Sequence, residues 1–125
     1  MATALSLHWR TCGDDHHWCS FRNLQLPLSN NPSGVYIIWI DSDPLMTIRV
    51  GKGDISARIA AHRTDEKIKY VEQTMVEHLH LRVTWAKVPE SSQESVEKFL
   101  SDRLDPLLGD RFPDVDPTPV NLPPW

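Results

Sequence analysis

The sequence predicts an α/β domain in which a small three-stranded antiparallel sheet is flanked by helices. Two apolar runs, 34–40 and 47–53, lie close together and are rich in β-branched residues, which favours a pair of strands. A third run, 81–88, alternates in polarity as a strand does. Helical periodicity is present at 54–62 and at 91–104. Because 125 residues suffice for one core of ordinary size, we expect a single domain.

Turn chemistry joins the first two strands. The segment Asp41-Ser42-Asp43-Pro44 separates them, and it contains the residue types that favour tight turns. We therefore expect the two runs to pair with each other as an antiparallel hairpin.

The helix after the hairpin is predicted to start at Asp54, whose side chain can cap it. Ile55 and Ile59 repeat with a spacing of four residues and are expected to face the core. Arg58 and His62 repeat with the same spacing on a neighbouring strip. A cation and an imidazole therefore share one face of this helix.

Apolar residues at helical spacing predict a second helix within 64–80, before the third strand. In the third strand, Leu81, Val83 and Trp85 are expected on one face of the sheet and the intervening residues on the other. Pro89 is expected to end this strand.

The helix predicted at 91–104 begins with Ser91-Ser92-Gln93-Glu94, which fits a capping box, and it stops at Asp105-Pro106. Its periodicity places Glu97 at the edge of the apolar stripe, whereas Glu94 points away. Glu97 is thus the carboxylate that we expect to face the sheet.

Two irregular segments complete the expected domain. The N-terminal preamble, 1–33, contains apolar side chains that are expected to pack, namely Trp9, Trp18, Phe21, Leu24 and Leu26. From residue 106 onward the chain contains six of its ten prolines, which predicts an extended tail at 110–125. The segment 34–109 between them is the expected α/β core.

The sequence contains no apolar run near the roughly 18 residues that a membrane span needs, and no apolar signal core near its start. We therefore expect a soluble, cytoplasmic protein without a membrane partner. Two cysteines are too few for a disulfide scaffold, so Cys12 and Cys19 are expected to be reduced thiols. They could instead bind a metal with His16 and His17, although zinc sites usually have a second ligand pair farther along the chain.

Charge is distributed unevenly along the chain, whose formal net charge is −4. Residues 49–69 contain six basic and three acidic residues, a local charge of +3 that leaves −7 elsewhere. A local group of cations suits an anionic ligand such as a phosphodiester. A solvated helix surface, however, has the same composition.

The order of these residues resembles the GIY-YIG nuclease superfamily across 34–109. The first family triplet is represented by Gly34-Val35-Tyr36 and the second by Arg49-Val50-Gly51, where Arg49 replaces the usual tyrosine. Lys52 follows the second triplet, as a lysine does in the excision-repair members. The resemblance implies a helix-flanked three-stranded sheet, which agrees with the periodicity of the chain.

Two helices extend the resemblance. Arg58 and His62 match the family's arginine and the histidine or tyrosine that follows four residues later. The pattern around the family's metal-binding glutamate is met by Glu97, Leu100 and Pro106. The ordered set is far more specific than any one triplet.

The resemblance implies a metal-dependent endonuclease that hydrolyses DNA, with Tyr36, Arg58, His62 and Glu97 as catalytic residues. Glu97 would be the metal ligand and would hold one Mg²⁺ or Mn²⁺ per active site. Tyr36 would orient or deprotonate the attacking water, with His62 as the alternative base. Arg58 would hold the scissile phosphate.

The resemblance also assigns substrate binding to Arg49, Gly51 and Lys52. Arg49 lacks the hydroxyl group of the tyrosine that it replaces, and Gly109 stands where the family has asparagine. These two changes favour an alternative interpretation, a nucleic-acid-binding module on the same fold with impaired catalysis. The acidic remainder of the chain favours a third, a protein-interaction domain. A single active site would nick DNA, and a homodimer would be needed for a coordinated double-strand cut.

Overall fold

The protein folds around a four-stranded antiparallel sheet in a computed structural model that describes residues 4–12, 17–75, 80–109 and 114–125. The strands are arranged across the sheet in the order β1-β4-β2-β3. In chain order the elements are β1 (Cys19–Ser20), β2 (Ser33–Asp41), β3 (Met46–Asp54), α1 (Ile55–Arg63), α2 (Glu66–Met75), β4 (His80–Lys87) and α3 (Glu90–Leu104). The α/β class and the antiparallel sheet are confirmed. The predicted strand number of three is wrong, because the preamble adds β1 to the edge of β4.

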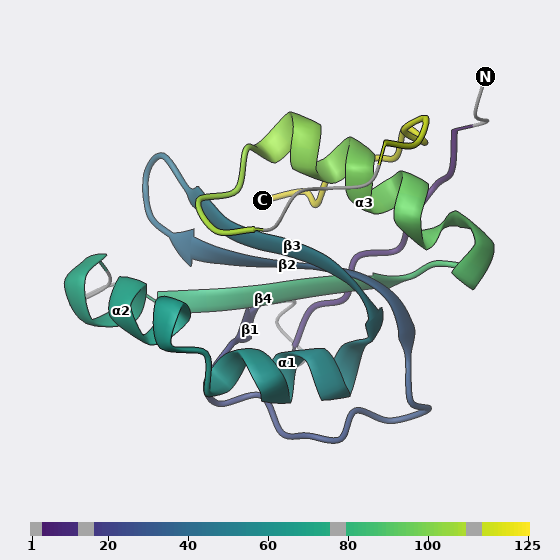
Figure 1. Ribbon diagram of the computed structural model, residues 1–125. Helices are drawn as coiled ribbons and strands as arrows, with labels where there is room; N and C mark the ends of the chain where they lie inside the picture. Colours follow the sequence, from purple (N-terminus) through teal and green to yellow (C-terminus); the bar gives the residue numbers. More distant parts are fainter. Residues whose placement is uncertain (1–3, 13–16, 76–79, 110–113) are drawn as a thin grey trace.

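The sheet separates two apolar layers, with α1 on one face and α3 on the other (Figure 1). Tyr36 and Ile38 point into the layer covered by α1, whereas Val35 and Ile37 point into the layer covered by α3. Strand β2 is central and is buried on both faces, which explains its nearly continuous run of apolar residues. We call the two sides of the sheet the α1 side and the α3 side.

The predicted hairpin and its continuation are confirmed. Strands β2 and β3 pair antiparallel, with Tyr36 directly opposite Gly51. Asp54 then caps α1, since its Oδ1 accepts a hydrogen bond of 3.2 Å from the backbone N–H of Ala57. The core positions predicted for α1 are both fully buried, so the helix packs on the sheet through the expected face.

The second predicted helix is shorter than 64–80. Helix α2 ends at Met75, residues 76–79 lie outside the described part of the chain, and His80 already belongs to β4. The alternation predicted for the third strand is confirmed, because Val83 and Trp85 face the α1 side. Periodicity identified both elements but could not locate the boundary between them.

The capping box predicted for the last helix is wrong. Helix α3 begins one residue earlier, at Glu90, and its N-cap is Pro89, which makes no side-chain capping hydrogen bond. The side-chain amide of Gln93 instead donates to Ser33 Oγ and to the carbonyl oxygen of Val88, each at 2.9 Å. Gln93 therefore ties the start of α3 to the neighbouring strands rather than to its own first turn.

The prediction that the two cysteines are reduced is also wrong. Cys12 and Cys19 form a disulfide, with their Cα atoms 5.0 Å apart. An antiparallel bridge between Cys12 and His17 folds this segment back on itself, so the two cysteines reach the separation that a disulfide spans. Their sulfur atoms are thus engaged with each other and not with a metal, and His16 lies outside the described residues.

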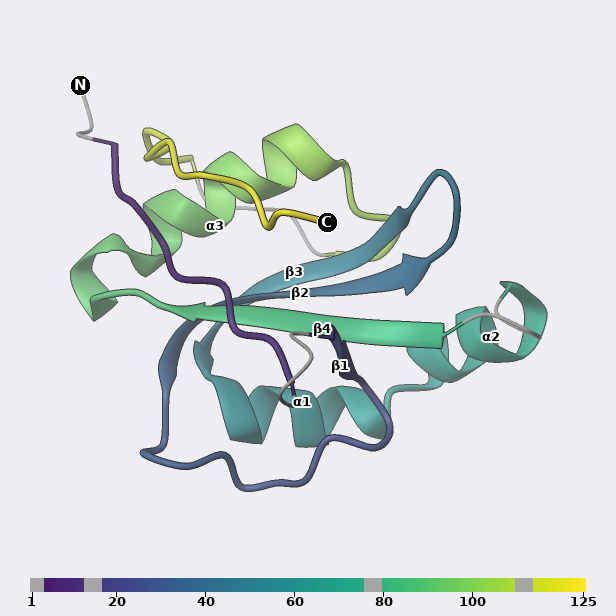
Figure 2. The same ribbon diagram turned by 180° about the vertical axis from the view of Figure 1, so that it is seen from behind.

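The tail packs beside α3 and the start of the chain, without regular secondary structure over 114–125 (Figure 2). Leu5 forms a parallel bridge with Val120. The ring of Trp125 lies 4.9 Å from that of Trp39, between ring centroids, on the α3 side. Residues 114–125 thus contain no helix or strand, while the extended form expected for the tail stays a prediction. None of the described helices has the length and apolar character needed to cross a membrane.

Candidate active site

A buried hydrogen bond joins Tyr36, in the middle of β2, to His62, in the last turn of α1. The phenolic oxygen of Tyr36 lies 2.6 Å from Nε2 of His62, and the two residues are only 2% and 8% exposed. Nδ1 of His62 faces a carboxylate oxygen of Asp65 at 4.0 Å. That charge favours the tautomer with its proton on Nδ1, so the hydroxyl of Tyr36 donates and Nε2 accepts.

Gly51 makes room for the Tyr36 ring. The two residues face each other across β2 and β3, and a Cβ atom built on Gly51 would collide with the hydroxyl and ring of Tyr36. Only glycine therefore allows the phenol to lie over this edge strand. Gly51 thus helps to form the site by leaving space for the Tyr36 ring. Its predicted role in substrate binding stays a prediction.

Burial and nearby cations shift the pKa values of this pair. Burial raises the pKa of the Tyr36 hydroxyl, while the charges of Arg49 and Arg58 oppose that rise. Burial, reinforced by Arg49, lowers the pKa of His62 to about 4, against the opposing effect of Asp65. Both groups are consequently neutral near pH 7, and His62 is available as a proton acceptor.

Glu97 of α3 is the buried carboxylate of the site, with an exposed fraction of 9%. Burial raises its pKa, and the charges of Lys52 and then Arg49 act in the opposite direction. In the described part of the chain the carboxylate accepts no hydrogen bond. The sequence-based expectation that Glu97 is turned inward and Glu94 outward is confirmed.

The site extends around the β3 edge of the sheet. Strand β3 is the edge strand, and its successive residues alternate between the two sides. Gly51 lies opposite Tyr36 on the α1 side, whereas Lys52 lies opposite Val35, which faces the α3 side. The charge of Glu97 contributes to the raised pKa of Tyr36, so groups carried by α1, α3 and β3 influence one another electrostatically.

Arg58 is exposed near the start of α1, where the chain leaves β3. Gly53 precedes the helix with a φ of +114°, a conformation that side-chain-bearing residues rarely adopt, and its position lies against the Arg58 guanidinium. Neither Gly53 nor Asp65 was predicted from the sequence to belong to the site. The glycine after Lys52 and the spacing of three residues between His62 and Asp65 could have indicated them.

The positive segment found in the sequence divides into two parts. Arg49, Lys52 and Arg58 all act on Glu97. Arg63, in contrast, has a structural role, because its Nε donates to the carbonyl oxygen of Phe21 at 2.9 Å.

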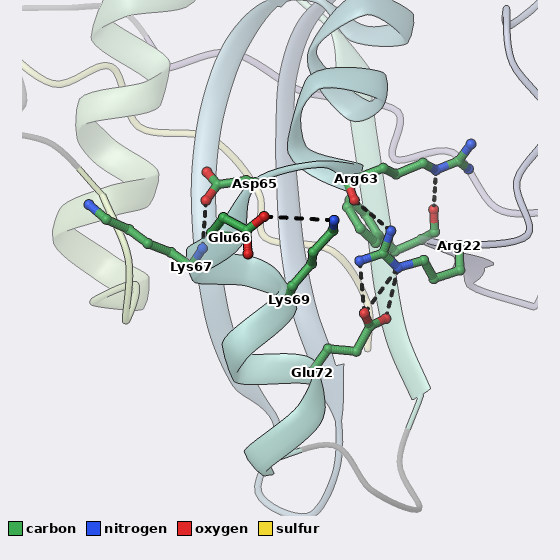
Figure 3. Close-up of polar contacts among 8 residues, drawn as sticks. Arg22, Arg63, Asp65, Glu66, Lys67, Lys69 and Glu72 are labelled. Carbon is green, nitrogen blue, oxygen red and sulfur yellow. Dashed lines mark hydrogen bonds and ion pairs between the residues drawn. The ribbon is translucent and has the colours of Figure 1, made fainter.

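Arg22 completes that structural part (Figure 3). Its guanidinium bridges the backbone carbonyl of Arg63 and the carboxylate of Glu72, linking the preamble to both α1 and α2 (Figure 3). Arg63 is therefore a structural residue and not part of a solvated helix surface, whereas Arg49, Lys52 and Arg58 remain candidates for ligand binding.

A metal ion at this site would have one protein ligand, the carboxylate of Glu97. Over the described residues, no three His, Cys, Asp or Glu side chains are grouped to hold a metal ion. Glu97 alone fits Mg²⁺, which commonly uses one or two carboxylates and completes its octahedron with waters and phosphate oxygens. The surrounding cations would repel an isolated metal, so the donor set suits an ion that binds together with a phosphate.

Comparison with protein-family models, curated proteins and solved structures yields no match to this chain. The resemblance to the GIY-YIG nucleases accordingly rests on the order of residues in the sequence alone.

Proposed function

We propose that this protein is a metal-dependent endonuclease of the GIY-YIG type that hydrolyses phosphodiester bonds in DNA. The observation that carries the proposal is the buried Tyr36–His62 hydrogen bond, at which the charges of Arg49, Arg58 and Glu97 also act. A tyrosine paired with a neutral imidazole offers both a proton acceptor and a path for the proton. A pair that served packing alone would need none of the surrounding charges.

Cations at the edge of the sheet provide the binding part of the proposal. Arg58 is exposed, and Arg49 and Lys52 are half-buried beside it on β3. Arginine binds phosphate oxygens in a forked, two-bond arrangement, whereas lysine contributes a point charge. The backbone of a nucleic acid would thus approach the edge strand with its phosphate between α1 and α3.

Tyr36 and His62 provide the proton transfer. The oxygen of Tyr36 accepts a proton from the attacking water while its own proton moves to Nε2 of His62, so that no free phenolate forms. The hydroxide equivalent then adds to phosphorus, and the bond to the leaving oxygen breaks. The leaving alkoxide takes a proton from solvent water, and His62 returns its proton to solvent, which restores both groups. A coupled transfer suits this site, because burial has made both the free phenolate and the free imidazolium costly.

Substrate binding would itself increase the basicity of His62. Arg49 and Arg58 lower the pKa of His62 in the absence of ligand. A bound phosphate offsets those charges, which allows the imidazole to hold a proton more readily. The proposed base would therefore become effective only when the scissile phosphate is in place.

Glu97 would hold Mg²⁺ or Mn²⁺, and the bound ion would supply stabilisation of the charge on the phosphorane and on the leaving oxygen. The raised pKa of Glu97 implies that ion binding displaces a proton more often than at an exposed carboxylate. Metal affinity should accordingly increase with pH through the range in which Glu97 loses its proton.

The second candidate function is binding of nucleic acid without cleavage. It is favoured by Arg49, whose guanidinium replaces the second tyrosine hydroxyl of the family and adds a phosphate-binding cation. In that case Tyr36 and His62 would be a packed polar pair, and the three cations would remain functional.

Nicking of supercoiled plasmid at low salt tests the proposal. Purified protein is assayed with Mg²⁺, with Mn²⁺ and with EDTA, beside Glu97→Ala and Arg58→Ala. We expect metal-dependent nicking that both substitutions abolish. A plasmid that is retarded on a gel but never cut would establish the binding module instead, and an absence of both cutting and binding would remove nucleic acid as the ligand.

A matched pair of variants controls for stability. Glu94→Ala removes an exposed carboxylate one turn from Glu97, and Lys98→Ala removes a lysine that pairs at 3.2 Å with Asp102 on the same helix. Both controls should cut like the unmodified protein. If they lose activity as Glu97→Ala does, the loss reflects helix α3 as a whole rather than its buried carboxylate.

A further inference from the structure

Two adjoining cavities lie beside β4, which β2 separates from β3 in the sheet. The larger, of about 550 Å³, lies between the preamble, the segment that precedes β2, and β4. The smaller, of about 100 Å³, is bounded by His8, Arg10 and Lys87, and these three residues also line the larger cavity. The two spaces thus share one wall of basic side chains.

The larger cavity combines an apolar interior with that basic wall. Its apolar lining includes Trp85, Leu24, Leu28 and Pro32. Its volume falls within the roughly 300–1,000 Å³ typical of small-molecule sites. Cavities of this size with an apolar body and a few polar groups are the usual form of a ligand site.

Among the described residues, no acidic side chain neutralises the basic wall. Arg10, Lys87 and His8 are exposed, and no ion pair is found for Arg10 or Lys87 in the described part of the chain. None of the described residues that line either cavity is Asp or Glu. The positive charges of Arg10 and Lys87 repel each other, and an anion bound between them would reduce that repulsion. This wall therefore favours an anionic group.

Arg10 is held in place by its backbone. Its N–H donates to the carbonyl oxygen of Trp85 at 2.9 Å, which fixes the preamble against β4. The Cys12–Cys19 disulfide anchors the same segment two residues later and joins it to β1. The wall is therefore attached to the sheet at two points before any ligand binds, which lowers the entropic cost of binding.

We propose that the paired cavities bind a nucleotide, with its phosphate in the small basic cavity and its base in the larger apolar one. The small space suits a compact anion, and the flat, largely apolar base suits a chamber lined by Trp85 and leucines. The hydroxyl groups of Thr11 and Ser29 in the lining can bond the sugar or the base edge. A free nucleotide and a nucleotide at the end of a nucleic-acid strand present the same chemistry.

The proposal does not depend on cleavage at Tyr36. Trp85 lies beside Tyr36 in the register of β4 and β2, but no residue assigned to the active site lines either cavity. A protein that bound a nucleotide here and cut nothing would support this site while contradicting the nuclease. The two proposals can therefore fail separately.

Calorimetric titration of the full chain tests the site with four probes, which are adenosine monophosphate, adenosine, inorganic phosphate and a short single-stranded DNA. We expect the nucleotide to bind more tightly than adenosine or phosphate alone. Arg10→Ala and Lys87→Ala should each weaken that binding about tenfold or more, because each removes a charged hydrogen-bond donor. Lys67→Ala, which removes an exposed lysine of α2 that lines neither cavity, should leave it unchanged.

Filling the chamber provides an independent variant. Ser29 is exposed at the cavity, so Ser29→Trp should fold normally and exclude the base. Tight binding of the DNA but not of the free nucleotide, weakened by Arg10→Ala, would identify a strand end as the ligand. The proposal is overturned if phosphate binds as well as the nucleotide, if neither nucleotide form binds, or if binding is insensitive to Arg10→Ala, Lys87→Ala and Ser29→Trp.

Discussion

Strand β2 takes part in two buried polar contacts, one on each side of the sheet, and they differ in chemistry. On the α1 side, the hydroxyl of Tyr36 bonds to His62 at 2.6 Å. On the α3 side, Nε1–H of Trp39 donates to Oγ1 of Thr84 at 3.0 Å. Both contacts satisfy polar groups that burial would otherwise leave without a partner. Burial and hydrogen bonding therefore cannot by themselves distinguish a functional pair from a structural one.

Titration and surrounding charge make the distinction. Neither member of the Trp39–Thr84 pair changes protonation in the physiological range. The Tyr36–His62 pair contains an imidazole whose pKa has been lowered to about 4, and Arg49 and Arg58 act on both of its members. Shifted pKa values that arise from burial together with specific charges are typical of functional sites. We expect substitutions in the Tyr36–His62 contact to change activity and those in the Trp39–Thr84 contact to change stability.

The largest loss of cleavage activity should come from Glu97→Gln. The amide has nearly the same shape but no charge with which to hold a divalent ion, so we expect cleavage to fall about a thousandfold, as loss of several kcal/mol of charge stabilisation implies. Initial rates of plasmid nicking measure the change. Glu94→Gln, at an exposed position of the same helix, should cut at the unmodified rate, and equal losses in the two variants would contradict a special role for Glu97.

Acid should weaken the fold through His62. Unfolded His62 binds a proton near pH 6.5, whereas the folded state binds it only near pH 4, so between these values the unfolded state binds more protons. The free energy of unfolding should thus fall by up to about 3 kcal/mol as pH decreases across this window. Glu97 acts in the opposite direction, because its raised pKa favours the folded state at low pH.

Urea denaturation at several pH values measures this dependence, and His62→Gln isolates it. The variant should show a shallower decline than the unmodified protein between pH 6.5 and pH 4. Identical pH profiles would mean that His62 is protonated as easily in the folded state as in the unfolded one, which would remove its proposed role as a neutral acceptor.

Gly51→Ala should lower both the stability of the fold and the rate of cleavage. The added methyl group collides with the hydroxyl and ring of Tyr36, and overpacking of this kind costs about 2 kcal/mol. Cleavage should also decrease, because Tyr36 can no longer lie in its place beside His62. Thermal unfolding and nicking rates measure the two effects. Unchanged behaviour in both would show that Tyr36 does not rest against this strand.

The smallest effect is expected for Thr84→Val on the α3 side. Valine preserves the shape but leaves the indole N–H of Trp39 without an acceptor, which costs about 1 kcal/mol. Cleavage should be unaffected, since no group of the proposed chemistry is touched. A large loss of activity with this variant would erase the contrast between the Trp39–Thr84 and Tyr36–His62 contacts.

Local sequence patterns were sufficient for the parts of the fold whose causes are local. The hairpin, the Asp54 cap and the two faces of β4 follow from turn residues, a capping side chain and alternation, all of which act within a few residues. The inward orientation of Glu97 followed from helical periodicity in the same way. The residues of the candidate site were found through their order, which a family resemblance supplied.

The remaining features depend on contacts between distant segments, which local patterns do not contain. Strand β1 exists because Cys19 and Ser20 meet β4, more than sixty residues away. The same pairing helps to bring Cys12 within reach of Cys19, whereas counting cysteines predicted free thiols. Gln93 likewise takes no part in a capping box and donates instead to Ser33 and Val88. Tertiary contacts overrode local preference in each case.

The central claim is that the hydroxyl of Tyr36 has a chemical role, and Tyr36→Phe tests it most directly. The substitution keeps the ring over Gly51 and removes only the group that bonds to His62. Nicking rates with Mg²⁺ should fall about a hundredfold or more, as loss of an acid–base group does, while thermal unfolding shows that the variant is still folded. A folded Tyr36→Phe protein that cuts DNA at the unmodified rate would contradict the account.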